Sequence, residues 1–194
     1  RDIVAAIHDA TERLNRLVGN VLDITRLESG HIKARFSESS VGDLVHLALT
    51  NTKVQLAKHK VSVEIAPDLH TVSMDFVLME QALTNLLSNA AFHTPAGTEV
   101  KVIVRMERET LIIEVSDRGP GIPSQSIGRL FDRFYRGPSA PTGGSGLGLS
   151  LVKGFVEAQG GAVHANNGSG GGAIFSIHLP LAKVPVVPVE PMHA

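Results

Sequence analysis

The chain has 194 residues, a formal net charge of −1 at pH 7 and no cysteine, which excludes disulfides, thiolate metal sites and cysteine nucleophiles. Its near-neutral charge gives no reason to expect binding to nucleic acid or to an acidic membrane surface. No apolar run approaches the roughly 18 residues of a membrane-spanning helix, and the length suits one sizeable core with or without a small appendage.

The first thirty residues predict one amphipathic helix that ends at Gly30. Its apolar residues recur at alternating steps of four and three and form a narrow seam. The seam consists of Ile3, Ile7, Ala10, Leu14, Leu17, Val21 and Ile24. Such a seam favours a partner helix in a coiled-coil-like bundle over a helix packed only on its own domain. Because the chain opens inside this helix without an initiator Met, we expect it to be a fragment of a longer protein.

Residues 41–94 predict a helix, a strand and a second helix. Residues 41–60 carry apolar side chains on one helical face, and 61–65 alternate apolar with polar residues, as in a half-buried strand. Asp75 is a suitable N-cap for the second helix, which should end at the turn sequence 94–97.

The C-terminal half predicts a hairpin, two loops rich in Gly and Pro, a helix and two further strands. The hairpin covers residues 100–116, and the loops cover 117–123 and 137–148. The helix covers 147–159, and the two strands cover 162–165 and 173–179. The complete order of elements predicts an α+β fold, a two-layer sandwich in which helices cover one face of a mixed β-sheet.

Two glycine-rich motifs could contact a ligand. Asp117 ends a predicted strand, and Gly119 and Gly121 allow a sharp turn beside a carboxylate that can accept from an adenine amino group. Residues 143–149, Gly-Gly-Ser-Gly-Leu-Gly-Leu, open a helix whose bare amides can cradle a phosphate. No strand precedes these glycines and no Lys-Ser or Lys-Thr follows, so neither the dinucleotide fingerprint nor a P-loop applies. Taken alone, the first motif more often marks a surface turn, and the second could equally be a flexible linker.

Asn85 and Asn89 lie one helical turn apart, so both amides share one helix face. An amide oxygen is a hard ligand that suits magnesium when the ion also binds phosphate oxygens. In isolation, a buried polar pair is the simpler interpretation. Together with the two glycine motifs, the pair could supply a metal ligand, a base acceptor and a phosphate cradle for one nucleotide.

In this order, the motifs resemble four boxes of the sensor histidine kinases and of a wider ATPase family that includes Hsp90, type II topoisomerases and mismatch-repair ATPases. The similar segments are 85–90 (N-box), 117–121 (G1 box), 130–136 (F-box) and 144–149 (G2 box). Residues 22–30 resemble the end of the second helix of the dimerisation hairpin, which favours the kinases. Residues 134–137 and 171–175 are most similar to the Kdp-type potassium sensors.

The resemblance implies a domain order and a set of ligand contacts. Residues 1–30 would be the second helix of a truncated dimerisation hairpin, 31–182 the ATP-binding catalytic domain and 183–194 an extended tail. ATP and Mg²⁺ would be bound, with Asn89 as the metal ligand and 137–145 as a lid. The implied ATP-binding residues are Asn85, Asn89, His93, Asp117, Gly119, Gly121, Arg136, Gly144, Ser145, Gly146, Leu147, Gly148 and Leu149.

The implied activity is that of a protein-histidine kinase. The γ-phosphoryl group would pass to a histidine outside this fragment and then to a response regulator. The full-length protein would be a homodimeric, membrane-anchored sensor, and this fragment would be cytoplasmic. No phosphoacceptor box is present, because His8-Asp9 lacks the Arg-x-Pro pattern that should follow. The fragment alone is therefore not expected to autophosphorylate.

Two alternatives remain at the level of the sequence. Phe92 stands where many of these kinases carry a Lys or Arg that meets a phosphate, which leaves open a nucleotide-binding interaction module without kinase activity. An ATP-hydrolysing relative is the other alternative. Asn85 speaks against it, because the hydrolysing relatives carry there a glutamate that activates water, and an amide cannot act as a base.

Overall fold

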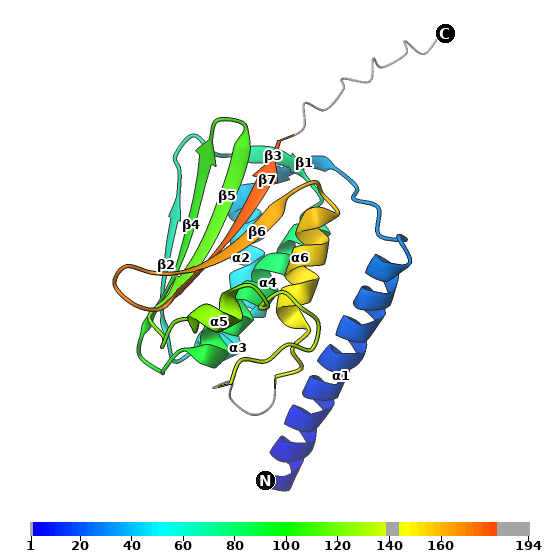
Figure 1. The fold of residues 1–194 in the computed structure, drawn as a ribbon, viewed down its shortest axis with the longest axis vertical. Coiled ribbons are helices and arrows are strands. Elements are labelled where there is room, and N and C mark those ends of the chain that lie inside the picture. The colour runs from blue at the N-terminus through cyan, green and yellow to red at the C-terminus, as the bar shows by residue number, and fades with distance from the viewer. Residues whose placement is uncertain (1, 139–143, 182–194) are drawn as a thin grey trace.

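The computed structural model describes residues 2–138 and 144–181. Its main sheet has five strands in the order β2-β4-β5-β7-β6, of which β2 and β4 are parallel and the other neighbours antiparallel. The strands are β2 (Lys60–Ile65), β4 (Glu99–Glu107), β5 (Thr110–Asp117), β6 (Ala162–Asn167) and β7 (Ala173–Pro180). The predicted mixed sheet is thus confirmed (Figure 1).

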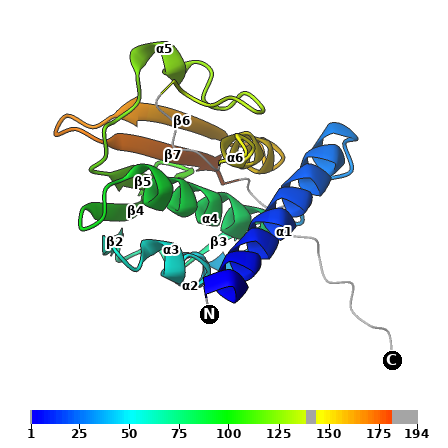
Figure 2. The same cartoon turned by 90° about the horizontal axis from the view of Figure 1, so that it is seen from below.

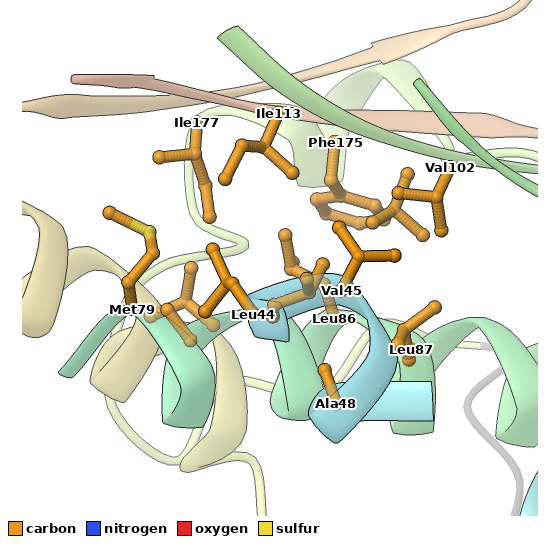
Figure 3. Packing of buried hydrophobic residues seen from close by; sticks show 14 of the residues in the cluster. Leu44, Val45, Ala48, Met79, Leu86, Leu87, Val102, Ile113, Phe175 and Ile177 are labelled. Carbon is orange, nitrogen blue, oxygen red and sulfur yellow. The ribbon is translucent and has the colours of Figure 1, made fainter. Parts of the chain in front are cut away.

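Helices cover one face of this sheet, which confirms the predicted two-layer α+β sandwich (Figures 1 and 2). They are α2 (Val41–Asn51), α4 (Phe76–His93) and α6 (Gly148–Glu157), with the short α3 (Lys53–Leu56) and α5 (Ser124–Ile127) in the connections. Leu44 of α2, Leu86 of α4 and Phe175 of β7 meet in the core between the layers (Figure 3). Burial of each such side chain stabilises the fold by about 1.5–3 kcal/mol relative to exposure.

The N-terminus of α4 is fixed by the predicted cap. Asp75 Oδ1 accepts from the backbone N–H of Leu78 at 3.1 Å, and Asp75 Oδ2 accepts from that of Arg35 at 2.7 Å. The backbone N–H of Asp75 in turn donates to Gln159 Oε1, at the end of α6, over 2.8 Å. These bonds lock α4 to α6 at one end. The opposite end of α4, at His93, is therefore held at a fixed place beside the sheet.

The structure corrects the helix predicted at 41–60. α2 ends at Asn51, and the short α3 follows before β2 begins at Lys60. The Thr52 hydroxyl donates to the Ala48 carbonyl at 2.7 Å, and the Thr52 backbone departs from the helical conformation. A hydroxyl that bonds back to the preceding turn competes with helix continuation, and apolar periodicity does not register this effect.

A second, two-stranded sheet is absent from the sequence prediction. β1 (Ser37–Ser40) pairs antiparallel with β3 (Thr71–Met74). The sequence of β1 is Ser-Glu-Ser-Ser, which has neither apolar alternation nor a preference for strands. Its conformation depends on backbone pairing with a segment far along the chain.

The first helix, α1 (Asp2–Glu28), stands outside the sandwich. The C-terminal end of α1 contacts α6 (Figure 2). Ile24 and Leu27 pack against the core, Glu28 forms an ion pair with Arg133, and Gly30 follows with a positive φ of 64°. Further apolar side chains of α1 are exposed, namely Ile7, Leu14, Leu17, Val18, Val21 and Leu22. This exposure argues against a helix packed only on its own domain.

None of the helices in the described part of the chain combines the length and the apolar character that a membrane crossing requires. The tail predicted from Lys183 onward lies outside the described residues.

Candidate nucleotide-binding site

Asp117 occupies the last position of β5 and is only 8% exposed. Its Oδ1 accepts from the backbone N–H groups of Gly119, at 2.7 Å, and Ala173, at 3.2 Å. Among the described residues, no group donates a hydrogen bond to Oδ2. A Cβ atom at Gly119 would lie 2.9 Å from Asp117 Oδ1 and 3.3 Å from the His93 carbonyl oxygen. Glycine therefore lets the turn pack closely against both the carboxylate and the end of α4.

The end of α4 brings the two asparagines and Thr94 to the same region. Asn85 Nδ2 donates to the Gln81 carbonyl at 2.9 Å, and Asn85 Oδ1 would lie 3.2 Å from a Cβ atom at Gly148, where α6 begins. Asn89 is half-buried, and its side chain makes no hydrogen bond within the described residues. Thr94 Oγ1 is buried, has no hydrogen-bond partner within the described residues, and would lie 3.5 Å from a Cβ atom at Gly119. Thr94 Oγ1 is thus an orphaned polar atom beside the Asp117 turn.

The glycine loop before α6 packs at Gly146 against the backbone of Phe134 and Tyr135. Gly146 has a φ of +70°, and a Cβ atom there would lie 2.9 Å from both Phe134 Cα and the Tyr135 carbonyl oxygen. Phe134 itself has a left-handed φ of 59°, and its side chain is exposed. Only glycine fits at 146, because a side chain would collide with rigid main chain. The predicted loop therefore has a fixed conformation at this point.

Some of the remaining predicted loop residues are buried in the protein, and others are exposed. Leu147 is fully buried and Leu149 packs against the core, so any ligand contact from them would come from the backbone. Ser145 Oγ accepts from the Leu147 N–H at 3.3 Å. Gly144 is exposed, and a Cβ atom there would lie 3.8 Å from the Phe92 ring. Residues 139–143 of the expected lid lie outside the described residues.

His93 lies between opposite charges at the end of α4. Burial is the largest influence on its pKa and lowers it from the ordinary value; Asp117 acts to raise the pKa and Arg136 to lower it. His93 therefore resists protonation in the folded state.

We expect the free energy of unfolding to decrease as the pH falls below 6.5, the ordinary pKa of histidine, because the unfolded state then binds a proton that folded His93 resists. Above this value, His93 is neutral in both states and contributes no slope. His93→Gln should flatten the decrease of Tm between about pH 6.5 and 5. The matched control is His70→Gln, which changes a second exposed histidine, directly before β3. Equal slopes for wild type and His93→Gln would contradict the expectation.

The structure thus brings Asn85, Asn89, His93, Asp117 and the glycine loop to one end of the sandwich. Sequence reasoning overlooked Thr94, which was treated only as part of a turn, and the left-handed Phe134 beside Gly146. It also overlooked Asn167, whose side chain bonds to the backbone of Ile122 after the Asp117 turn. No local signal identifies Asn167, because its partner lies far along the chain.

A family model described as "Histidine kinase-, DNA gyrase B-, and HSP90-like ATPase" matches residues 74–183. The chain belongs to this family. This chain is 34% identical over 183 residues to the sensor protein KdpD of Clostridium acetobutylicum. The match covers 93% of this chain and 20% of KdpD, so the chain spans about a fifth of that relative. The predicted family and the similarity to Kdp-type sensors are confirmed.

Solved structures of sensor kinases share the fold of this ATPase-family domain. Full-length ShkA in complex with AMPPNP has a TM-score of 0.80 at 26% identity, over 93% of this chain and 38% of ShkA. The mycobacterial sensor histidine kinase MprB has a TM-score of 0.67 at 28% identity, over 76% of this chain and 98% of the MprB chain.

ATP fits the site of this domain on three observations. Asp117 Oδ2 accepts no hydrogen bond from the described residues, so it can accept from an adenine amino group. Thr94 Oγ1 is a buried polar atom that has no hydrogen-bond partner among the described residues. The glycines at 144, 146 and 148 carry no side chain, so the backbone amides at the start of α6 are bare. Within the described residues, no cluster of three His, Cys, Asp or Glu side chains forms a metal site. Magnesium would therefore need phosphate oxygens as additional ligands.

Proposed function

We propose that this domain binds Mg²⁺-ATP and, in the full-length protein, donates the γ-phosphoryl group to a histidine outside this chain. The observation that carries the proposal is the convergence of Asp117, Asn89 and the glycine loop at one end of the sandwich. Three elements far apart in sequence supply a base acceptor, an oxygen ligand and a row of bare amides. A single nucleotide would use all three.

The proposal gives the predicted residues at the site distinct roles. Asp117 accepts from the adenine amino group, and the turn formed with Gly119 and Gly121 shapes the base pocket. Asn89 holds Mg²⁺, which neutralises phosphate charge when it is bound. The backbone amides of 144–149 bind phosphate oxygens where α6 begins, aided by the positive end of the helix dipole. Asn85 supports the start of α6, and Arg136 supplies a cation.

The choice of kinase over hydrolase follows from Asn85. A phosphoryl transfer to histidine requires positioning and neutralisation of charge, whereas the hydrolysing relatives carry at this position a glutamate that activates water. The amide of Asn85 cannot act as a base, and its Nδ2 already donates to the helix backbone. Transfer onward to a response regulator completes the proposed activity.

The primary test is calorimetric titration of the domain with ADP and with AMPPNP, each with and without Mg²⁺. We expect saturable binding of both nucleotides, and tighter binding of AMPPNP when Mg²⁺ is present. A longer chain that restores the upstream helix should then become labelled on histidine by ATP. Absence of nucleotide binding by the folded domain would refute the proposal at its first step.

Asn89→Ala should remove most of the magnesium dependence of AMPPNP binding. The amide oxygen is the proposed protein ligand, so its loss should reduce the ratio of affinities with and without Mg²⁺ by about tenfold. Asn166→Ala, which removes an exposed amide on β6, is the matched control. Calorimetry at constant ionic strength measures the ratio. An unchanged ratio for Asn89→Ala would assign the metal to other ligands.

The second candidate is an interaction module that binds nucleotide but transfers nothing. Phe92 favours it, because the aromatic ring stands beside Gly144 and places no charge there. The histidine-labelling experiment separates the two. Tight binding of ATP without label in a chain that contains the acceptor histidine would select the interaction module.

The wider architecture is also proposed. The exposed apolar residues of α1 suit pairing within a dimerisation hairpin, so the full-length protein would be a homodimer with this domain in the cytoplasm and an anchor in the membrane. Residues 31–182 would form the catalytic domain. Potassium sensing rests on the similarity to KdpD alone, and the dependence of histidine labelling on potassium in the full-length protein tests it.

A further inference from the structure

We propose that Asn167 is a positioning residue that holds the turn after Asp117, so that the Asp117 carboxylate faces the nucleotide base. Asn167 is the last residue of the edge strand β6. No sequence motif of the site includes it. The inference rests on the proposed nucleotide binding and concerns how this chain recognises the base.

The side chain of Asn167 makes a two-way hydrogen-bonded pair with the backbone of Ile122. Asn167 Oδ1 accepts from the Ile122 N–H at 2.6 Å, and Asn167 Nδ2 donates to the Ile122 carbonyl at 2.8 Å. The Asn167 amide thus satisfies both the N–H and the carbonyl group of Ile122, as a residue of a neighbouring β-strand would. Ile122 is buried, so the turn ends at a residue that is fixed by both its side chain and its backbone.

The approach of Asn167 depends on a glycine in the turn. Gly121 has a φ of +75°, and a Cβ atom there would lie 2.8 Å from Asn167 Oδ1. Any other residue would be strained and would push the amide away from Ile122. The second glycine of the Asp-x-Gly-x-Gly motif therefore has a structural purpose in this chain, which is to admit Asn167.

The start of the same turn is held by β7. The Ala173 N–H donates to Asp117 Oδ1, and Gly172 packs directly against the Asp117 carbonyl oxygen. The connection between β6 and β7 is itself closed by the Gly168 N–H, which donates to the Gly172 carbonyl at 3.0 Å. The strands β6 and β7 therefore hold the two ends of the Asp117–Ile122 turn separately.

Loss of the Asn167 amide would release one end of a segment that contains two glycines. The released turn would sample more conformations, and Asp117 would spend less time in the orientation that meets the base. The amides of 144–149 and Asn89 belong to other elements, so binding of the phosphates would continue. The effect of the substitution should therefore be specific to the base.

The test compares ADP with inosine diphosphate, which carries a carbonyl in place of the adenine amino group. Calorimetry on the whole chain gives both dissociation constants for wild type, Asn167→Ala and the isosteric Asn167→Asp, with Asn166→Ala as the control. We expect wild type and the control to prefer ADP by about tenfold or more, and Asn167→Ala to reduce that preference to about threefold or less, chiefly through weaker ADP binding. Asn167→Asp keeps the acceptor for the Ile122 N–H but turns a charged oxygen toward the Ile122 carbonyl oxygen, so it should also reduce the preference.

The thermal midpoint of each variant is measured alongside, and the exposure of Asn167 predicts that all variants fold. An unchanged preference in folded Asn167→Ala and Asn167→Asp would overturn the inference. Equal weakening of ADP and inosine diphosphate would also overturn it, because the role would then be general stability. If wild type binds neither nucleotide, the proposed function itself fails, and that result is distinct from either outcome.

Discussion

Asp117→Asn is expected to weaken ADP binding about 100-fold. The wild-type carboxylate uses Oδ1 for two backbone donors and leaves Oδ2 for the ligand. An asparagine has only one acceptor oxygen. If that oxygen stays with the N–H groups of Gly119 and Ala173, its NH₂ group faces the adenine amino group, and two donors oppose each other. If the amide turns over, the two backbone donors lose their acceptor.

Calorimetric titration with ADP measures this loss, and the thermal midpoint shows whether the variant remains folded. Asp68→Asn is the matched control, because it makes the same chemical change at an exposed position between β2 and β3. Wild-type affinity in Asp117→Asn would show that the base binds elsewhere. A variant that binds poorly because it has unfolded would be recognised by its thermal midpoint.

Gly146→Ala should also reduce nucleotide affinity by about 100-fold. The new Cβ atom would approach Phe134 Cα and the Tyr135 carbonyl oxygen at 2.9 Å, and both belong to the main chain. Because the φ of +70° is also unfavourable for alanine, the loop must move rather than adjust a side chain. Its amides would then no longer point to a common phosphate position.

Gly160→Ala is the control for backbone strain alone. Gly160 has a similar φ of +77° but nothing within 4 Å of the added atom, and it lies after α6 at the end remote from the loop. We expect it to cost about 1 kcal/mol of stability and to leave binding unchanged. Titrations with AMPPNP in the presence of Mg²⁺ compare the two variants. Similar affinities for both would show that the Gly146 contact with the F-box backbone is unimportant.

Features that depend on local interactions are the ones that the sequence predicts correctly. The left-handed turn that ends a helix is a local event, so Gly30 is predicted correctly from its position after a periodic segment. The same applies to the Asp75 cap and to the hairpin of β4 and β5, whose apolar residues alternate along each strand. In each case, the deciding interactions lie within a few residues of one another.

The segments proposed to bind the nucleotide could be identified for a related reason. Asp117, Asn89 and residues 144–149 carry their chemistry in short, ordered segments, and their order along the chain indicated that one nucleotide could use all of them. Only the folded chain places Thr94 Oγ1 beside Gly119 and the Phe92 ring beside Gly144. These contacts join α4 to loops that lie far from it in sequence.

The sequence by itself determined the α+β sandwich, because periodicity, caps and turn glycines are local properties, and its ordered motifs indicated the family through their resemblance to known boxes. The end of α2 at Asn51 follows from the Thr52 hydroxyl, a local effect that apolar periodicity does not register. The tertiary structure alone decided that β1 pairs with β3 and that the Asn167 side chain bonds to the backbone of Ile122. Each of these two features depends on a partner that is distant in sequence. Hydrogen bonds of this kind leave no pattern in the residues between the partners, so their existence becomes evident only when the chain is folded.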